Sequence, residues 1–325
     1  MVQSRISRRS ALAAGAAFVA ANRVPALAQD DGTNVPDPYN EDGGALPASP
    51  PSPTPEPNTP TPAAELPVGE GVLPAFRVIS YYGFPGNPNM GILGEYDKET
   101  LLSRLQSQAQ EYADADPSRP MKLAFEVIES VAQADAGADG LYLARTDPAI
   151  IQEYIDFTAQ NDLLLILDCQ FGYDTLENEL NALREYLRYP HVHPALDPEF
   201  MMKPGEQPGV DLGAITGEQV TVAQQTIAAW AGEDGLAPKI LIVHQFNYYM
   251  IENKEVIKPV DGVQLVIDAD GWGSPEDKAA SYDVVITQSP IEFNGIKLFY
   301  PQDSPLMSAA ETLAFQPTPD LIIYQ

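Results

Sequence analysis

The sequence predicts a closed (β/α)8 barrel formed by a single domain, and three observations support this fold class. From about residue 71 to the end, eight short apolar segments alternate with segments of helical periodicity. Six of the apolar segments end in an acid, a His or a Gln, as expected where barrel strands open onto a site. The region has roughly 255 residues, close to the ~250 typical of one barrel. An open, doubly wound sheet is the main alternative, but no Gly-rich nucleotide loop is present.

The expected strands are mostly apolar, as parallel strands covered by helices should be. They span residues 77–82, 122–129, 163–168, 193–199, 239–244, 263–268, 296–300 and 321–324. Helices are expected from Asp97, from Asp147 and over 175–187, 218–231 and 275–285. Asp97 is of a residue type that favours the N-cap position, and Asp147 before Pro148 is a common helix start.

The first 28 residues have the features of an export signal. Arg5, Arg8 and Arg9 form a basic start, an Ala-rich apolar run follows, and residues 26–28 match an A-x-A cleavage site. The Arg pair within Ser7–Leu12 resembles a twin-arginine signal, although an ordinary secretion signal is the alternative. We therefore expect an exported protein, extracellular or associated with the cell envelope. We expect no transmembrane segment in the mature chain, because no other apolar run reaches ~18 residues.

Residues 29–70 form a second compositional region, which contains eleven prolines and few large apolar side chains. Such a composition cannot bury a core and favours extended conformations, so we expect a disordered linker or stalk before a barrel domain at 71–325. The chain has 46 acidic and 18 basic residues, a net charge of −28. This charge argues against nucleic acid as a partner. Cys169 is the only cysteine, so no internal disulfide is possible.

Carboxyl groups at the strand ends are the strongest candidates for chemistry. Asp197 and Glu199 follow Ala195, and alternation in a strand would place all three on the barrel-facing side. Asp268 and Asp270 repeat this spacing, and Glu126 ends the second strand. A carboxyl group beside another acid has a raised pKa, which is what a general acid requires. We therefore predict catalytic roles for Glu199, Asp197, Asp268 and Glu126.

Acids, amides and aromatic rings near the other strand ends are typical of a carbohydrate site. The predicted ligand-binding residues are Tyr81, Tyr82, Asp168, Gln170, His244, Gln245, Asp270, Trp272 and Tyr324. Purely structural roles are the alternative, with Asp197 capping a turn and His244 buried in the core. A divalent ion on His244 and nearby acids is a further alternative, but the predicted site contains no metal and no cofactor.

The Asp197-Pro198-Glu199 element at the end of the fourth strand resembles the last part of the Asp-x-x-Asp-x-Asp-x-Glu motif of family 18 glycoside hydrolases. It is also similar to the Asp-x-Glu element of family 25 lysozymes. The resemblance implies that Glu199 is the acid and Asp197 its partner, whereas Val192 and Ala195 occupy positions where family 18 has acids. The opening Tyr-Tyr-Gly-Phe-Pro-Gly-Asn at 81–87 is similar to that of uncharacterised secreted bacterial barrel proteins.

The function expected from this pattern is that of an exported, monomeric, glycoside-hydrolase-like barrel acting on a polysaccharide or glycan. The alternative is a non-catalytic barrel that binds a glycan or cell-wall component from a Pro-rich stalk. Enzymatic activity stays open at this point, because the Asp-x-Glu element lacks the earlier acids of the family 18 motif.

Overall fold

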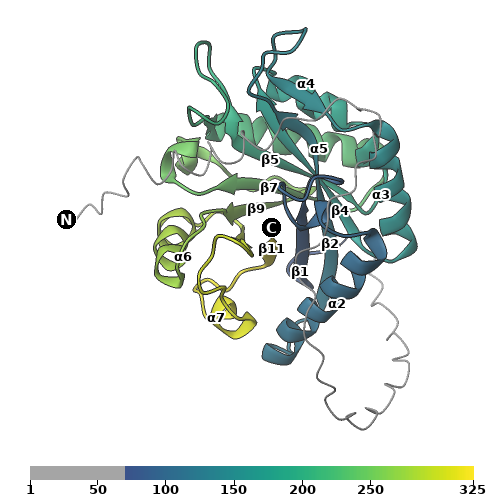
Figure 1. Ribbon diagram of the computed structural model, residues 1–325, viewed down its shortest axis with the longest axis vertical. Helices are drawn as coiled ribbons and strands as arrows, with labels where there is room; N and C mark the ends of the chain where they lie inside the picture. The colour runs from purple at the N-terminus through teal and green to yellow at the C-terminus, as the bar shows by residue number, and fades with distance from the viewer. Residues whose placement is uncertain (1–69) are drawn as a thin grey trace, which may run out of the picture. The chain divides into compact units, whose positions relative to one another are not determined.

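A computed structural model describes residues 70–325, and the predicted signal at 1–28 and nearly all of the predicted linker at 29–70 lie outside them. Helices surround a ring of strands in Figure 1. The strands are β1 Arg77–Gly83, β2 Met121–Ala132, β3 Leu143–Arg145, β4 Leu164–Gly172, β5 Val192–Met201, β6 Ile215–Thr216, β7 Lys239–Gln245, β8 Ile251–Glu252, β9 Val263–Ala269, β10 Phe293–Leu298 and β11 Leu321–Tyr324. The α-helices are α2 Lys98–Ala115, α3 Pro148–Gln160, α4 Leu176–Leu183, α5 Gly217–Glu233, α6 Pro275–Tyr282 and α7 Ala309–Leu313. Short helical turns occur at Ile92–Gly94, Tyr186–Arg188, Tyr248–Met250, Lys254–Val256 and Asp283–Thr287.

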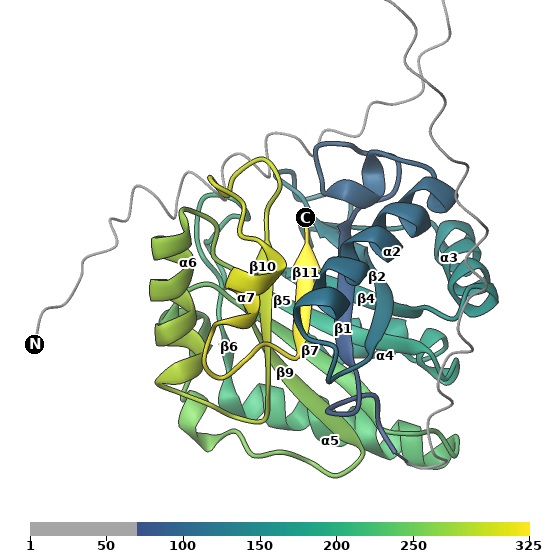
Figure 2. The same ribbon diagram turned by 90° about the horizontal axis from the view of Figure 1, so that it is seen from below.

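The predicted closed barrel is confirmed. Eight strands pair in the order β1-β11-β10-β9-β7-β5-β4-β2, all in parallel, and β1 pairs with β2 to close the ring. Figure 2 shows that the first strand, β1, and the last strand, β11, lie side by side. In this parallel pair, Val78 is the register partner of Leu321. Strand β3 adds an antiparallel edge to β2 outside the ring.

Helix starts follow the expected side-chain chemistry. The side chain of Asp97 accepts a hydrogen bond from the backbone N–H of Thr100, and Asp147 caps α3 just before Pro148. Thr216 and Gln219 form a reciprocal capping box at the start of α5. The predicted helix over 175–187 is shorter and ends at Leu183. The predicted seventh strand, 296–300, is observed over 293–298, so it begins three residues earlier.

Two hydrophobic clusters correspond to the two faces of the strands. One lies between the barrel and its helices and includes Leu105, Ile155 and Leu167. The other fills the barrel interior and includes Ala124, Ile166 and further buried residues, which together come from seven strands. Because the interior cluster is apolar along the lower and middle strands, the polar inward residues gather at the C-terminal ends. Among residues 70–325, no helix has the length and apolar character needed to cross a membrane.

Candidate active site at the barrel mouth

One layer of polar side chains lies inside the barrel at the carboxyl ends of its strands. Five of these side chains continue the inward alternation of an apolar residue two positions earlier, for example Asp197 after Ala195 and His244 after Ile242. We call this set the mouth cluster. It consists of Tyr82, Glu126, Asp168, Asp197, Glu199, His244, Asp268, Asp270 and Lys297. All of its side chains are buried except those of Glu199 and Asp270, which are partly exposed.

His244 on β7 is the centre of the cluster. Its Nε2 atom lies 2.9 Å from Oε1 of Glu126 and 3.9 Å from Oδ1 of Asp168. Its Nδ1 atom lies 3.0 Å from Oδ2 of Asp268 and 3.6 Å from Oδ2 of Asp270. Burial and Lys297 lower the pKa of His244, but the carboxylates outweigh both and raise it well above its usual range. The imidazole is therefore held between two pairs of acids.

Lys297 on β10 supplies a second positive charge. Its Nζ atom lies 3.6 Å from the centre of the Tyr82 ring and 3.4 Å from Oδ2 of Asp270. Burial lowers the pKa of Lys297, but Asp270 and Glu126 raise it above the usual value, so the ammonium stays charged. The hydroxyl of Tyr82 donates a hydrogen bond to Oδ2 of Asp168 at 3.0 Å.

The carboxyl groups nearest the rim have raised pKa values. Burial, followed by the charge of Asp168, raises the pKa of Asp197 to about 7. Burial, followed by the charge of Asp197, raises the pKa of Glu199 well above its usual range. The backbone N–H of Glu199 donates to Oδ1 of Asp197 at 3.2 Å, which fixes the two residues relative to each other. Burial also raises the pKa of Asp168 and of Asp270.

The structure brings all four predicted catalytic residues, Glu126, Asp197, Glu199 and Asp268, into this one cluster. Of the predicted ligand-binding residues, Tyr82, Asp168, His244 and Asp270 also belong to it. Whether any of them acts on a substrate stays a prediction. Lys297 is a member that the sequence analysis missed, although a Lys between Ile296 and Leu298 in an apolar strand is a signal of an inward polar position.

Other predicted ligand-binding residues make their side-chain hydrogen bonds with groups outside the cluster. Tyr81 and Tyr324 point outward, with their rings 6.3 Å apart, and the hydroxyl of Tyr324 is 2.8 Å from that of Tyr112. Gln170 accepts a hydrogen bond from the backbone N–H of Ala132.

The side chains of two further predicted ligand-binding residues, Gln245 and Trp272, form no hydrogen bond with the mouth cluster among the interactions of residues 70–325. Gln245 accepts a hydrogen bond from Lys254 and borders a surface hollow of about 380 Å³ beside Tyr248 and Tyr249. Trp272 is 41 % exposed after the end of β9.

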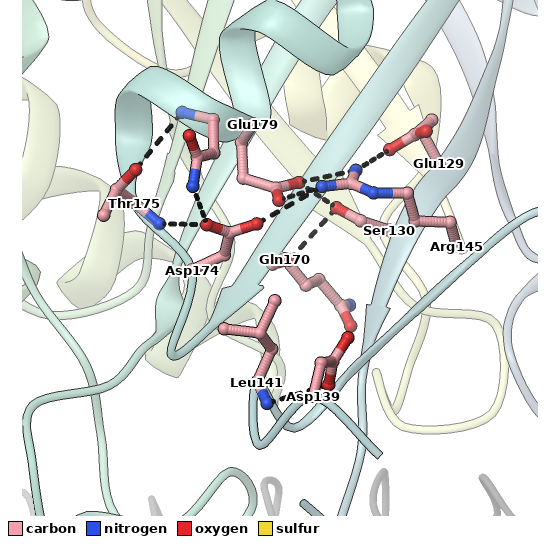
Figure 3. A network of polar contacts seen from close by, with 10 residues as sticks. Glu129, Ser130, Asp139, Leu141, Arg145, Gln170, Asp174, Thr175 and Glu179 are labelled. Carbon is pink, nitrogen blue, oxygen red and sulfur yellow. Dashed lines mark hydrogen bonds and ion pairs between the residues drawn. The ribbon is translucent and has the colours of Figure 1, made fainter. Parts of the chain in front are cut away.

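A second polar network lies between the barrel and α4, and Figure 3 shows it from close by. The guanidinium of Arg145 on β3 contacts Glu179 at 2.5 Å, Glu129 at 3.1 Å and Asp174 at 3.4 Å. The hydroxyl of Ser130 also donates to Glu179. Because these groups bond one another, the network connects β3 to α4. We therefore interpret it as a structural network and not as a substrate site.

Two sets of residues at the mouth have atoms close enough to hold a metal ion. They are Glu126, Asp168 and His244, and His244, Asp268 and Asp270, and within each set one ligand atom per residue lies within 4.8 Å of the others. A third set, Glu129, Cys169 and Glu179, belongs to the Arg145 network. Several mouth oxygens fit a cation because they are buried and lack a hydrogen-bond partner within residues 70–325.

The comparisons with known proteins identify no family. No protein-family model and no curated protein matches the sequence. One solved structure that matches is described as "Structure of oxaloacetate acetylhydrolase in complex with the product oxalate". It is 14 % identical, covers 77 % of this chain and 75 % of that chain, and has a TM-score of 0.38. This likeness concerns the fold alone and does not give the present chain that protein's reaction.

The predicted glycoside-hydrolase or glycan-binding function is wrong, and nothing in residues 70–325 shows the predicted carbohydrate partner. Three of the four rings expected to contact a sugar, Tyr81, Tyr82 and Tyr324, are each at most 2 % exposed and bonded to other protein groups. The fourth, Trp272, is exposed. The exposed pair Tyr248 and Tyr249 borders the hollow beside Gln245, which no mouth carboxyl lines.

Proposed function

We propose that this chain is a hydrolase that acts on a small, neutral or cationic substrate at the C-terminal mouth of its barrel. One observation carries the proposal: six carboxyl groups, one imidazole and one ammonium from six strands gather in a single, mostly buried layer. Charged groups are costly to bury, so a collection of this size is rarely structural alone. Barrel enzymes carry their sites at this end of the strands.

Glu199 is suited to the role of general acid. It lies at the rim and is partly exposed, so a substrate can reach it. Burial and the charge of Asp197 raise the pKa of Glu199 well above its usual range, which favours the protonated form that a general acid needs. In the proposed reaction it gives its proton to the leaving group as the bond to that group breaks.

Asp197 is suited to the role of general base. With a pKa of about 7 it is partly ionised at neutral pH and can accept the proton of an attacking water. Glu199 and Asp197 share a face of β5, so both approach a substrate from one side of the mouth. His244 lies deeper and holds the surrounding acids in place through both of its ring nitrogens.

The charge of the mouth selects the substrate. Six carboxyl groups outnumber the two basic groups, so an anionic substrate would meet repulsion in a region of low dielectric. The partly exposed groups, Glu199 and Asp270, are few, which favours a small substrate. On the sequence of residues 1–28, we further propose that the enzyme is exported, and that it works as a monomer.

Hydrolysis of nitrophenyl esters and anilides with neutral, cationic or anionic acyl groups tests the proposal. We expect turnover of neutral or cationic members, reduced by at least about 100-fold in Glu199→Gln, since general acids contribute on that scale. Glu255→Gln is the matched control, because Glu255 is exposed at the surface hollow and should leave turnover unchanged. Equal turnover in Glu199→Gln, or a preference for anionic substrates, would contradict the proposal.

A further inference from the structure

The two sides of the His244 ring differ in their direct contacts with other charged groups. On the Nδ1 side, Asp268 lies 3.0 Å from the ring and Asp270 lies 3.4 Å from the ammonium of Lys297. On the Nε2 side, the contacts of Glu126 and Asp168 are with Nε2 itself and with the hydroxyl of Tyr82. The Nε2 side therefore has two carboxylates and no lysine contact among the interactions of residues 70–325.

Unpaired atoms occur on the same side. Oε2 of Glu126 and Oδ1 of Asp168 are buried and have no hydrogen-bond partner within residues 70–325, and both side chains are fully buried. Ser80 is an independent observation, because it is not an acid. It precedes Tyr82 on the inward face of β1, and its buried hydroxyl also has no partner in that part of the chain. Buried polar atoms are nearly always paired, so these atoms indicate a missing group.

The Nδ1 side also has free oxygens, Oδ1 of Asp268 and Oδ1 of Asp270, but the carboxylate of Asp270 is already paired with the ammonium of Lys297 at 3.4 Å. Oδ1 of Asp268 lies against the backbone of Gly295 on β10, where a Cβ atom would approach it to 2.6 Å. Strand β10 therefore covers this oxygen. Glu126 and Asp168 lie on the adjacent strands β2 and β4. The free Oδ1 of Asp168 lies 3.9 Å from Nε2 of His244, and Glu126 contacts Nε2 through its other oxygen, Oε1. The Nε2 side is the better place for an additional atom.

We propose that Nε2 of His244 and the carboxylates of Glu126 and Asp168 bind one divalent cation. One imidazole nitrogen with two carboxylates suits a borderline ion such as Mn²⁺ or Zn²⁺ better than Ca²⁺, which takes oxygen ligands only. Asp268 then acts as the positioning residue that accepts the Nδ1–H of His244, an arrangement typical of histidine ligands of metals.

This inference deepens the proposed hydrolase and rests on it for its biological meaning. A bound divalent ion polarises a substrate oxygen and lowers the pKa of a bound water. The residues retain their own tasks: Glu126, Asp168 and His244 hold the ion, whereas Asp197 and Glu199 at the rim move protons.

The inference can be tested by measuring metal binding to the purified full chain, without any assay of turnover. After treatment with chelator, titration with Mn²⁺ should show one site, and pulsed EPR of bound Mn²⁺ should show coupling to an imidazole nitrogen. Glu126→Gln and Asp168→Asn should each weaken binding by at least about 100-fold, beyond what loss of an outer-shell contact usually causes. Glu179→Gln is the matched control, because Glu179 is equally buried but belongs to the Arg145 network.

Three outcomes would overturn the inference: no stoichiometric binding, binding that survives Glu126→Gln, or binding lost equally in Glu179→Gln. If Glu126→Gln fails to fold, the EPR spectrum of Mn²⁺ bound to the unaltered chain still tests the site. Absence of coupling to a nitrogen would exclude His244 as a ligand and would contradict the inference. The two proposals fail separately. Tight binding without turnover contradicts the hydrolase alone, and full turnover in the chelated protein contradicts the metal site alone.

Discussion

Nδ1 of His244 lies 3.0 Å from Oδ2 of Asp268, and the two residues are register partners on the adjacent strands β7 and β9. The ring orientation is therefore set by strand pairing and not by a mobile loop. Asp268 is in turn the register partner of Gly295 on β10, which leaves room for its carboxylate. Three neighbouring strands thus fix the centre of the mouth cluster, as preorganised sites require.

Gly295→Ala should destabilise the chain by about 1–3 kcal/mol, the usual cost of overpacking a tight interior. The new Cβ atom would lie 2.6 Å from Oδ1 and 3.1 Å from Cα of Asp268, so the strand itself must shift. Urea denaturation measures the effect. Gly232→Ala in α5 is the control, because no atom lies within 4 Å of its Cβ position and Ala favours a helix. If both variants were equally stable, β10 would not be packed against Asp268.

Tyr82→Phe should cost about 1–3 kcal/mol, because it leaves a second oxygen of the buried Asp168 without a partner. Combined with Asp168→Asn, the loss should be clearly less than the sum of the two single losses, since the two groups bond each other. Urea denaturation of the two single variants and the double variant provides this cycle. Tyr249→Phe, at a 65 % exposed ring, should change stability little. Additive losses would show that Tyr82 and Asp168 do not interact.

Much of the barrel could be predicted from the sequence, because helix-covered parallel strands are apolar and end in polar residues. The alternation rule also placed Asp197 and Glu199 with Ala195 on one face, and Asp197 does join Ala195 inside the barrel. The rule fails where the register is unknown. Gln245 directly follows His244, so only one of them can point inward, and the sequence does not say which.

The prediction that Tyr81 and Tyr324 bind a ligand also depended on knowing which side chains of a strand point inward. Tyr81 and Tyr82 are adjacent, and both are bulky and partly polar, so composition does not distinguish the inward ring from the outward one. Tyr82 points inward to Asp168, whereas Tyr81 packs outside with Tyr300 and Tyr324. Arg145 lies on the edge strand β3, which has three residues and gives no periodicity to detect. The contacts around it depend on tertiary packing alone.

Arg145→Ala should destabilise the chain by about 2–3 kcal/mol, somewhat less than the 3–5 kcal/mol of a fully buried pair, because Arg145 is 38 % exposed. Removing the guanidinium leaves Glu129 and Glu179 buried without their cation. The additional change Glu179→Gln should restore part of the loss, because it removes one uncompensated charge. Urea denaturation compares these variants with Arg188→Ala, which breaks only an exposed pair. A similar small loss in both single variants would contradict the structural role of the network.

Asp197 should make the stability of the chain depend on pH in a defined direction. Its pKa is about 7 in the folded chain, because of burial and then Asp168, and an unfolded Asp has a pKa of ~3.9. The folded chain therefore binds more protons between these values. Stability from this group is fully present below about pH 4 and is lost as the pH rises through about 7.

Asp197→Asn removes this dependence because an amide does not titrate. Relative to the unaltered chain, the variant should gain stability between pH 5 and pH 8, by at most about 3 kcal/mol at 1.36 kcal/mol per pKa unit. Urea denaturation at both pH values measures the difference. Asp116→Asn is the control, because hydrogen bonds from Ser118 and then Arg77 lower the pKa of Asp116 to about 2, so both of its titrations lie below pH 5. A pH-independent difference for Asp197→Asn would mean that the carboxyl is already ionised at pH 5, and Asp197 could then not act as a base that titrates near neutrality.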